Sequence, residues 1–402
     1  MKQNRVLNFL NLQSLLVAGF AAAVWPIISQ LKIAERWAKA REAGIASLPP
    51  VSIILPARNE EKNIEKCLRS LLSQSYPDFE VIAVDDGSQD ATPQILARLA
   101  PEYPNLKIVT LEGKLPEGWS GKVHAMHNGV KAARPQSQWF LFSDADTVHY
   151  PNALEFSITR ALQNKLDLFS ALSKLELVSF WEKLLMPLVI LGISLQYPEK
   201  KVNSEKSKLA IANGQYLLLR REAFEQVGGW ETLKNSIVDD RDMAVLMKSS
   251  GKKIAVYNGE KLLQVRMYTG LKEIWQGFGK NAFVGSRAAY VIVPFFAASL
   301  FVAGLLPFVQ LFYAMLKWLT PGKGKVSRLF WHSLFQISLL AIMRRRLDRA
   351  LGIPANYTLF TPLATPVWIG ILLDSMWRSI KGGGVVWKGR TYANPTKTQK
   401  ML

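Results

Sequence analysis

Five acidic side chains stand at or just beyond the ends of short apolar runs that could be β-strands. They are Glu60, Asp85, Asp86, Asp144 and Asp146. If these runs form neighbouring parallel strands, the five side chains gather at one edge of the sheet, where such sheets bind their ligands. Carboxylates that repel one another need a cation or a hydrogen-bonding ligand to be tolerated. The pattern therefore predicts a site for a cation or for a hydrogen-bonding ligand.

Asp144 and Asp146 are the strongest candidates for metal ligands. Two carboxylates one residue apart at the end of a strand can share a hard cation such as Mg²⁺ or Mn²⁺, which keeps open positions for phosphate oxygens. An isolated Asp-x-Asp sequence is also typical of a solvated turn. The second acidic turn, Asp85-Asp86, ends another predicted strand, and this agreement favours the metal site.

The chain between residues 45 and 285 alternates between strand and helix patterns. Apolar runs predict strands at 51–56, 79–84, 106–111 and 139–142. Helical patterns are found at 60–74, 92–99 and 122–133. Such alternation is typical of an α/β fold with a doubly wound, mostly parallel sheet.

Residues 6–31 carry no charged side chain and are mostly apolar. Since about 20 such residues cross a bilayer, we expect an uncleaved transmembrane anchor within the N-terminal segment 1–44. The cations that follow it are Lys32, Arg36, Lys39 and Arg41. Basic flanks favour the cytoplasmic side. The pattern predicts an integral protein of the inner membrane whose central region faces the cytoplasm.

A second apolar region, 286–402, contains uncharged runs at 288–316, 329–343 and 351–373. Their composition predicts membrane helices, although the middle run is too short for a full span and is compatible with a re-entrant or interfacial segment. Basic residues, among them Arg344, Arg345 and Arg346, lie in the connections between the runs. Buried core helices of a soluble protein are the alternative interpretation.

The composition excludes several classes of protein. The chain has 402 residues, with 50 Lys and Arg against 31 Asp and Glu, a formal charge of +19 and 49% hydrophobic residues. So many apolar residues exclude a disordered tail, and the single cysteine, Cys67, excludes a disulfide scaffold. Much of the excess positive charge flanks apolar runs, where anionic lipids attract it. We therefore expect a membrane as partner, and no nucleic acid.

Five ordered motifs resemble those of the family 2 glycosyltransferases, which have the GT-A fold. They are 51–60 (VSIILPARNE), 84–90 (VDDGSQD), 143–146 (SDAD), 213–230 (NGQYLLLRREAFEQVGGW) and 238–244 (VDDRDMA). The resemblance implies a GT-A domain over residues 45–285. The segment 1–44 before it would be the anchor with its basic juxtamembrane residues, and 286–402 would be a C-terminal membrane region with a basic tail.

Three further segments are similar to a membrane-bound branch of that family, which includes hopanoid-associated and carotenoid glycosyltransferases. They are 118–122 (GWSGK), 266–268 (RMY) with 273–281 (EIWQGFGKN), and 386–392 (VWKGRTY). Processive polysaccharide synthases carry Gln-x-x-Arg-Trp, whereas residues 264–268 read QVRMY. This departure favours the transfer of a single sugar over polymer synthesis.

The resemblance also implies roles for individual residues. Asp240 aligns with the general base of the family, and Asp144 and Asp146 align with its ligands for Mg²⁺ or Mn²⁺. The residues implied for binding the nucleotide sugar are Pro56, Glu60, Asp85, Asp86, Lys122, Asp144 and Arg266. Those implied for the acceptor side are Gly214, Tyr216, Trp230 and Asp239.

The function implied is that of a membrane-bound inverting hexosyltransferase. It would move one sugar from a nucleotide-diphosphate sugar, preferably UDP-linked, to the hydroxyl of a lipid such as a carotenoid, a hopanoid or a similar isoprenoid. A polyprenyl-phosphate glycosyltransferase and a non-catalytic lipid-binding partner with the same fold are the alternatives. The apolar segment 184–193 is too short to span a bilayer. It either lies in the interface and holds the lipid acceptor or is a core helix.

Overall fold

The computed structural model describes residues 10, 12–19, 21–22, 24–25, 44–45, 47–281, 289–320, 327–380, 385–387 and 390–392. The chain forms two compact units. The first, here called the sheet unit, comprises Glu35–Glu176 and Tyr197–Met267. The second, the helical unit, comprises Met1–Ala34, Leu177–Gln196 and Tyr268–Leu402.

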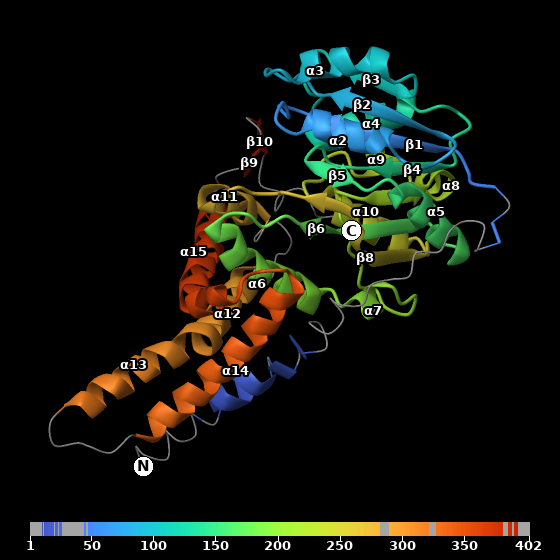
Figure 1. The fold of residues 1–402 in the computed structure, drawn as a ribbon. Helices are drawn as coiled ribbons and strands as arrows, with labels where there is room; N and C mark the ends of the chain where they lie inside the picture. The colour runs from blue at the N-terminus through green and yellow to red at the C-terminus, as the bar shows by residue number, and fades with distance from the viewer. Residues whose placement is uncertain are drawn as a thin grey trace. The chain divides into compact units, whose positions relative to one another are not determined.

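The sheet unit contains an eight-stranded sheet of order β3-β2-β1-β4-β7-β6-β8-β5 (Figure 1). The strands are β1 (Val51–Ala57), β2 (Phe79–Asp85), β3 (Leu106–Thr110), β4 (Trp139–Phe142), β5 (Thr147–His149), β6 (Leu168–Leu175), β7 (Leu217–Arg220) and β8 (Ile254–Val265). Strands β1 to β4 are parallel, as predicted, and β6 is parallel to β8. Strand β7 is antiparallel to β4 and β6, and β5 is antiparallel to β8. The predicted α/β fold with a mostly parallel sheet is confirmed.

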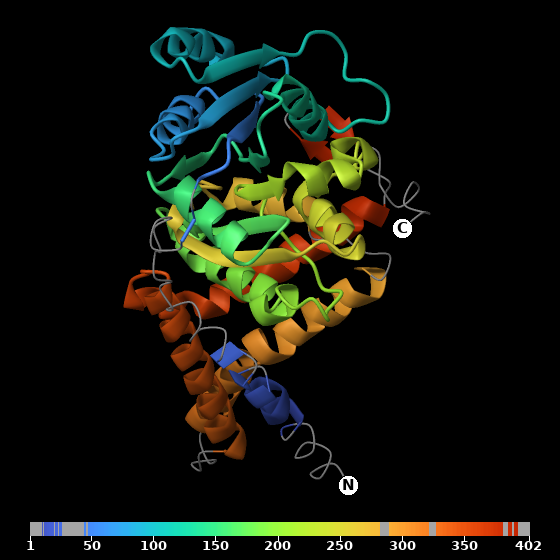
Figure 2. The same cartoon turned by 90° about the vertical axis from the view of Figure 1, so that its right-hand side faces the viewer.

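Helices pack on both faces of this sheet. They are α2 (Ile64–Leu72), α3 (Thr92–Leu99), α4 (Gly121–Ala132), α5 (Ala153–Gln163), α7 (Glu199–Val202), α8 (Arg221–Gln226), α9 (Gly229–Thr232) and α10 (Asp239–Ser249), with a 3₁₀ turn η1 at Ala100–Glu102. Figure 2 shows the blue helix α2 and the teal helix α4 on opposite sides of the first strands. The predicted helix 60–74 begins later, at Ile64, because residues 61–63 form a turn.

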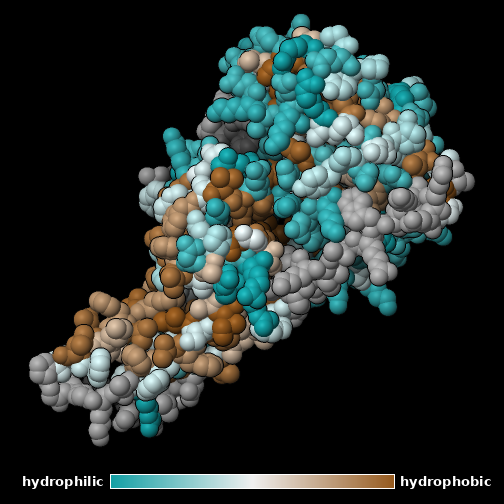
Figure 3. All heavy atoms as spheres, viewed as in Figure 1, coloured by the Kyte–Doolittle hydropathy of each residue, from teal (hydrophilic) through white to brown (hydrophobic). Residues whose placement is uncertain are grey.

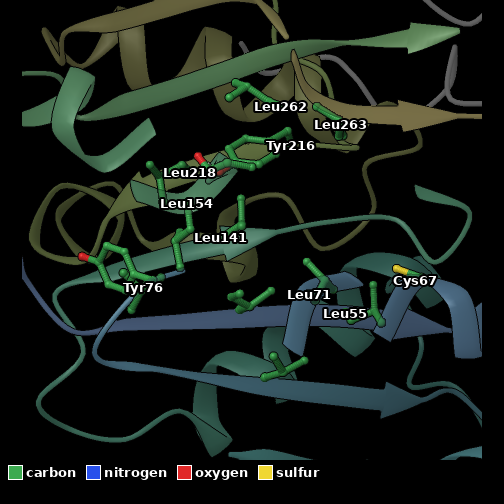
Figure 4. Packing of buried hydrophobic residues seen from close by; sticks show 14 of the residues in the cluster. Leu55, Cys67, Leu71, Tyr76, Leu141, Leu154, Tyr216, Leu218, Leu262 and Leu263 are labelled. Carbon is green, nitrogen blue, oxygen red and sulfur yellow. The ribbon is translucent and has the colours of Figure 1, made fainter. Parts of the chain in front are cut away.

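The core of the sheet unit lies in two layers, because successive side chains of a strand point to opposite faces. On β1, Ile53 and Leu55 pack with α2, α3 and α5, whereas Ile54 packs with α4, α8, α9 and α10. Figure 4 shows side chains of the first layer, with Leu55 close to Leu71 of α2. Gly129 lets α4 approach the sheet closely, since a Cβ there would lie 2.4 Å from Cγ2 of Ile54.

Part of the helical unit is an insertion in the sheet unit, because the chain leaves the sheet unit after Glu176 and returns at Tyr197. Its helices are α6 (Phe180–Gln196), α11 (Leu271–Asn281), α12 (Ala289–Leu300), α13 (Leu306–Leu319), α14 (Arg328–Ala350) and α15 (Thr361–Ile380), joined by a π-helical turn η2 (Phe301–Leu305) and a 3₁₀ turn η3 (Ala355–Phe360). A two-stranded ribbon, β9 (Val385–Trp387) and β10 (Arg390–Tyr392), follows. Residues 388–389 of the predicted tail motif lie outside the described residues.

Two helical stretches in the described part of the chain are long and apolar enough to cross a membrane. They are Val293–Leu319 and Ala355–Arg378. Large apolar side chains on this unit are exposed, for example Phe295 at 72% and Phe335 at 63%. Figure 3 shows hydrophobic side chains gathered over α13.

The predicted anchor 6–31 lies partly outside the described residues, as do Lys32, Arg36, Lys39 and Arg41. The described positions within it, from residue 10 to residue 25, are helical and expose Leu12, Leu15 and Leu16. The prediction that Arg344–Arg346 lie in a connection between apolar runs is wrong. Helix α14 continues through them to Ala350, because the Arg344 side chain is buried and paired rather than solvated.

Helix α6 contains a proline that disturbs its hydrogen bonds. Pro187 has no N–H group with which to bond the carbonyl of Lys183, four residues earlier. Arg344 of α14 supplies donors instead: its Nη2 donates to Lys183 O at 2.8 Å and its Nη1 to Leu184 O at 2.9 Å. The guanidinium therefore satisfies backbone carbonyls beside the proline.

Two further residues complete this arrangement. Trp368 of α15 donates from Nε1 to Leu185 O at 3.1 Å. Asp348, which is fully buried, accepts from Arg344 Nε at 2.7 Å and from Thr358 Oγ1 at 3.1 Å. We call Arg344, Asp348 and Trp368 the α6 clamp, because together they attach α6 to α14 and α15.

Candidate active site

The strand register brings the predicted acidic turns to one edge of the sheet. Strand β1 lies between β2 and β4, with Ile54 level with Ile82 on one side and with Phe142 on the other. Strand β2 ends at Asp85, and Asp144 follows the end of β4. The carboxyl ends of these three parallel strands therefore meet, as the sequence predicts.

Asp85 holds the first acidic turn in shape. Its Oδ1 accepts hydrogen bonds from the backbone N–H and the hydroxyl of Ser88, at 3.1 and 2.5 Å. Arg58, which directly follows β1, holds the same turn: its Nη1 donates to the carbonyls of Asp86 and Gly87. Gly87 has a φ of +65°, a conformation that favours glycine. The turn is thus built into a fixed shape beside the metal motif.

Two more of the predicted donor-binding residues lie at the end of β1. Pro56 is half-buried in the strand itself, and Glu60 follows it as a half-buried residue. The backbone N–H of Glu60 donates to Thr92 Oγ1 at 2.8 Å, which fixes the chain between the strand and α3. Asp86 is buried, with 7% of its surface exposed.

Lys122, in the first turn of α4, is the centre of a cluster of carboxylates. Its Nζ lies 2.7 Å from Asp144 Oδ1 and 3.3 Å from Asp239 Oδ2. Burial lowers the pKa of Lys122, but the charges of Asp144, Asp239 and Asp240 outweigh it and raise this pKa well above its ordinary value. Lys122 is therefore a permanent cation that joins the metal motif to the start of α10.

Asp240, in the first turn of α10, is held in place by two backbone N–H groups. Gly214 N donates to its Oδ2 at 2.8 Å, and Arg241 N donates to its Oδ1 at 2.8 Å. Burial and the charge of Asp239 raise the pKa of Asp240 to about 6, against the opposing effect of Lys122. A carboxylate with such a pKa is suited to accept a proton near neutral pH.

Asp146 presents an unsatisfied oxygen at the same edge. Its Oδ1 is buried and has no hydrogen-bond partner among the described residues. Burial and the charges of Asp144 and Glu60 raise the pKa of Asp146 to about 7. An orphaned carboxylate oxygen beside a second carboxylate fits a hard divalent cation. The described residues form no cluster of three His, Cys, Asp or Glu side chains that could hold a metal. A cation held by one or two carboxylates has positions for phosphate oxygens and water.

The four predicted acceptor-side residues separate into two pairs. Gly214 and Asp239 belong to the site: a Cβ at Gly214 would lie 3.1 Å from Lys122 Nζ and 3.4 Å from Asp240 Oδ2. Tyr216 and Trp230 lie instead in the two core layers, at 0% and 1% exposure. They support the sheet rather than face a ligand.

Tyr216 has a structural hydrogen bond of its own. Its hydroxyl lies 2.6 Å from Ser157 Oγ and donates to Ala153 O at 3.1 Å. Figure 4 shows its ring among Leu218, Leu154 and Leu262. Arg266, the last of the predicted donor residues, directly follows β8 and has an exposed side chain.

A polar network that sequence analysis did not predict supports Gly214. Asn213 Nδ2 donates to Ala171 O at 2.9 Å, and Ser173 Oγ donates to Gln215 Oε1 at 2.7 Å. The sequence contains a signal for this network, because Asn213 and Gln215 flank Gly214 in an otherwise apolar stretch. The pairing of Lys122 with Asp239 was also missed, since these residues are far apart in the chain.

Comparison with known proteins gives a family match for the part of the chain that carries Lys122, Asp144 and Asp146. Residues 52–228 match glycosyl transferase family 2. A 4,4'-diaponeurosporenoate glycosyltransferase of Staphylococcus aureus is 26% identical over 352 residues, which cover 85% of this chain and 88% of that protein. A beta-monoglucosyldiacylglycerol synthase of Trichormus variabilis is 31% identical over 206 residues, which cover 49% of this chain but only 41% of that protein.

A solved structure supports the fold. The mannosyltransferase PcManGT from Pyrobaculum calidifontis, in complex with GDP-Man and Mn²⁺, superposes with a TM-score of 0.51 at 18% identity and covers 93% of this chain and 98% of its own. Such a likeness shows a shared fold, in agreement with the GT-A expectation. The match of residues 52–228 to glycosyl transferase family 2, together with these relatives, supports a glycosyltransferase.

Proposed function

We propose that the chain is a membrane-bound inverting glycosyltransferase that moves one sugar from a UDP-sugar to the hydroxyl of an apolar lipid. The observation that carries the proposal is the position of Asp240. Two backbone N–H groups fix its carboxylate, and it adjoins Asp239, which with Asp144 lies against the same lysine ammonium. A base and a diphosphate-binding cation thus belong to one cluster.

The donor half of the cluster suits a nucleotide diphosphate. Glu60, Asp85 and Asp86 would bind the base and ribose, and Lys122 and Arg266 would face the phosphate oxygens as cations. Asp144 and Asp146 would hold Mg²⁺ or Mn²⁺. The chemistry that such a cation supplies when bound is neutralisation of charge on the leaving diphosphate.

Asp240 would act on the acceptor. Its carboxylate accepts the proton of the acceptor hydroxyl while the hydroxyl oxygen attacks the anomeric carbon and the bond to the diphosphate breaks. One such displacement inverts the anomeric configuration. With a pKa of about 6, Asp240 is ionised at neutral pH and still basic enough for general base catalysis, which contributes about 10²–10⁴-fold.

The helical unit supports a lipid acceptor. Val293–Leu319 and Ala355–Arg378 are long enough to span a bilayer. The named relatives are a 4,4'-diaponeurosporenoate glycosyltransferase and a beta-monoglucosyldiacylglycerol synthase. We propose an integral protein of the inner membrane with its active site on the cytoplasmic side. The acceptor would be a carotenoid, a hopanoid or a related isoprenoid alcohol, reached from the bilayer.

The test is mass spectrometry of lipids from membranes that contain the wild-type protein or the Asp240→Asn variant, incubated with UDP-sugar. We expect a lipid that has gained one hexose, and a loss of about 10²–10⁴-fold in the variant. Asp78→Asn is the matched control, because it makes the same change at a carboxylate whose partner is Arg134, away from the cluster. Its activity should equal that of the wild type.

Other outcomes identify the alternatives. A phosphate or carboxylate acceptor is already ionised, so Asp240→Asn would then remain active. With a polyprenyl phosphate the product would also carry a phosphate. A wild-type protein that neither transfers sugar nor hydrolyses any nucleotide sugar would contradict the proposal and leave a lipid-binding role.

A further inference from the structure

Lys122 lies beside one of the two carboxylates of the candidate metal site. Its Nζ lies 2.7 Å from Asp144 Oδ1, and Asp144 is one of the two carboxylates that fit a divalent metal. An ammonium at hydrogen-bond distance offsets the negative charge of that carboxylate, and it repels any other cation that binds there. Lysine and metal therefore compete for Asp144.

The structure also provides a second position for the ammonium. Asp239 Oδ2 lies 3.3 Å from Lys122 Nζ, is buried, and accepts no hydrogen bond from the described residues. An oxygen left unsatisfied in this way gains when a donor turns toward it. Gly214 leaves room for the movement, since a side chain there would contact Nζ at 3.1 Å.

We propose that Lys122 is an internal counter-cation that neutralises Asp144 before the donor binds and turns toward Asp239 and the diphosphate once it has bound. This inference rests on the proposed function, because it needs a nucleotide diphosphate as the anion that takes over Lys122. Its consequence is cooperativity: metal alone meets a site already neutralised by lysine, whereas metal and nucleotide together relieve the competition.

The experiment measures Mn²⁺ binding to the full-length protein in detergent, by electron paramagnetic resonance of the free ion, with and without UDP. For the wild type we expect UDP to tighten Mn²⁺ binding by about 5- to 150-fold, the usual range of coupling between two ligands. For Lys122→Met we expect Mn²⁺ alone to bind about tenfold more tightly than to the wild type, and the effect of UDP to shrink.

Three further variants make the result specific. Lys122→Gln should behave like Lys122→Met, which covers the case that the methionine variant does not fold. Lys122→Arg keeps the charge and should retain the weak binding of Mn²⁺ alone. Lys131→Met changes an exposed lysine of the same helix and should leave both affinities unchanged.

Two results would overturn the inference, and they differ in what else they remove. If Lys122→Met and Lys122→Gln bind Mn²⁺ alone no more tightly than the wild type, Lys122 does not compete with the metal, and the proposed function stands. If the wild type binds no Mn²⁺ even with UDP, the metal-dependent donor site fails together with the inference.

Discussion

Lys122 of the sheet unit and Arg344 of the helical unit are both cations beside carboxylates, but their surroundings differ in kind. Lys122 has one short contact, to Asp144, and a longer one, to an oxygen of Asp239 that is left without a hydrogen bond. Arg344 is 4% exposed and donates from all three guanidinium nitrogens, to Asp348 and two carbonyls. Lys122 therefore has a second acceptor within reach, whereas every nitrogen of Arg344 already donates a hydrogen bond.

The choice of residue agrees with this difference. Lysine carries a compact charge on a flexible stem, while arginine has a planar fork whose donors point in fixed directions. The α6 clamp requires donors that point in fixed directions, because Arg344 must reach the carbonyls of one helical turn beside Pro187. The cluster around Lys122 requires a positive charge that can interact with both Asp144 and Asp239.

Breaking the clamp should produce the largest change in stability. Arg344→Met leaves the buried Asp348 without its ion-pair partner and removes the donors to Lys183 O and Leu184 O. Removing one member of a buried pair costs about 3–5 kcal/mol. The measurement is chemical unfolding of the protein in detergent micelles. The double variant Arg344→Met/Asp348→Leu should be less destabilised than Arg344→Met alone. A loss in Arg344→Met below about 1 kcal/mol would show that the clamp is not rigid.

The pH dependence of sugar transfer tests the cluster formed by Lys122, Asp144, Asp239 and Asp240. The pKa of Asp240 is raised to about 6, and a general base must be ionised, so activity should be full above this pH and fall about tenfold per unit below it. The measurement is kcat/KM at saturating metal. Because the charge of Lys122 lowers the pKa of Asp240, the fall should begin at a higher pH in Lys122→Met. A wild-type profile that stays flat to about pH 5 would contradict the assignment of Asp240.

Trp368→Phe tests one hydrogen bond of the α6 clamp, because it keeps an aromatic side chain, although a smaller one, and removes the Nε1–H donor. The Nε1–H group donates to Leu185 O, and the loss of one such hydrogen bond costs about 0.5–1.5 kcal/mol. The same unfolding measurement applies. The control is Trp331→Phe, since Trp331 is 61% exposed and its replacement should be neutral. Equal effects of the two changes would contradict the role of the Trp368 hydrogen bond.

Gly214→Ala changes the space beside Lys122 and should have the smallest effect of the four changes on activity or stability. The added Cβ would lie 3.1 Å from Lys122 Nζ, so the ammonium must shift by a few tenths of an ångström. A side chain displaced from its preferred rotamer costs about 0.5–1.5 kcal/mol, which we expect to see as a modest loss of kcat/KM and an unchanged free energy of unfolding. A large loss of stability would instead mean that the glycine serves the fold.

Local patterns predicted the first half of the sheet unit well. Strands β1 to β4 and helices α3 and α4 agree with their predicted ranges to within one residue at each end, because each is a short apolar run or an amphipathic repeat bounded by polar turns. The direction of β7 could not be predicted, since a four-residue apolar strand fits a sheet in either orientation. Its antiparallel pairing with β4 depends on how the whole chain folds.

Individual side chains were harder to place than strands. Tyr216 and Asp240 both belong to motifs of the family, yet one is packed in the core and the other lies in the site. A motif marks a segment and not the direction of each side chain. The burial of Arg344 was missed as well, although its spacing of four residues from Asp348 was a usable signal for a pair on one helix face.

The insertion of α6 has a practical consequence. Since the chain leaves the sheet unit after Glu176 and returns at Tyr197, no contiguous fragment contains that unit alone. A truncation that removes the last hundred or so residues still retains Phe180–Gln196 but lacks Arg344 and Trp368, so the helix keeps a proline and loses the donors that satisfy its carbonyls. A water-soluble catalytic fragment would need residues 177–196 replaced by a polar linker, in addition to any shortening at the ends.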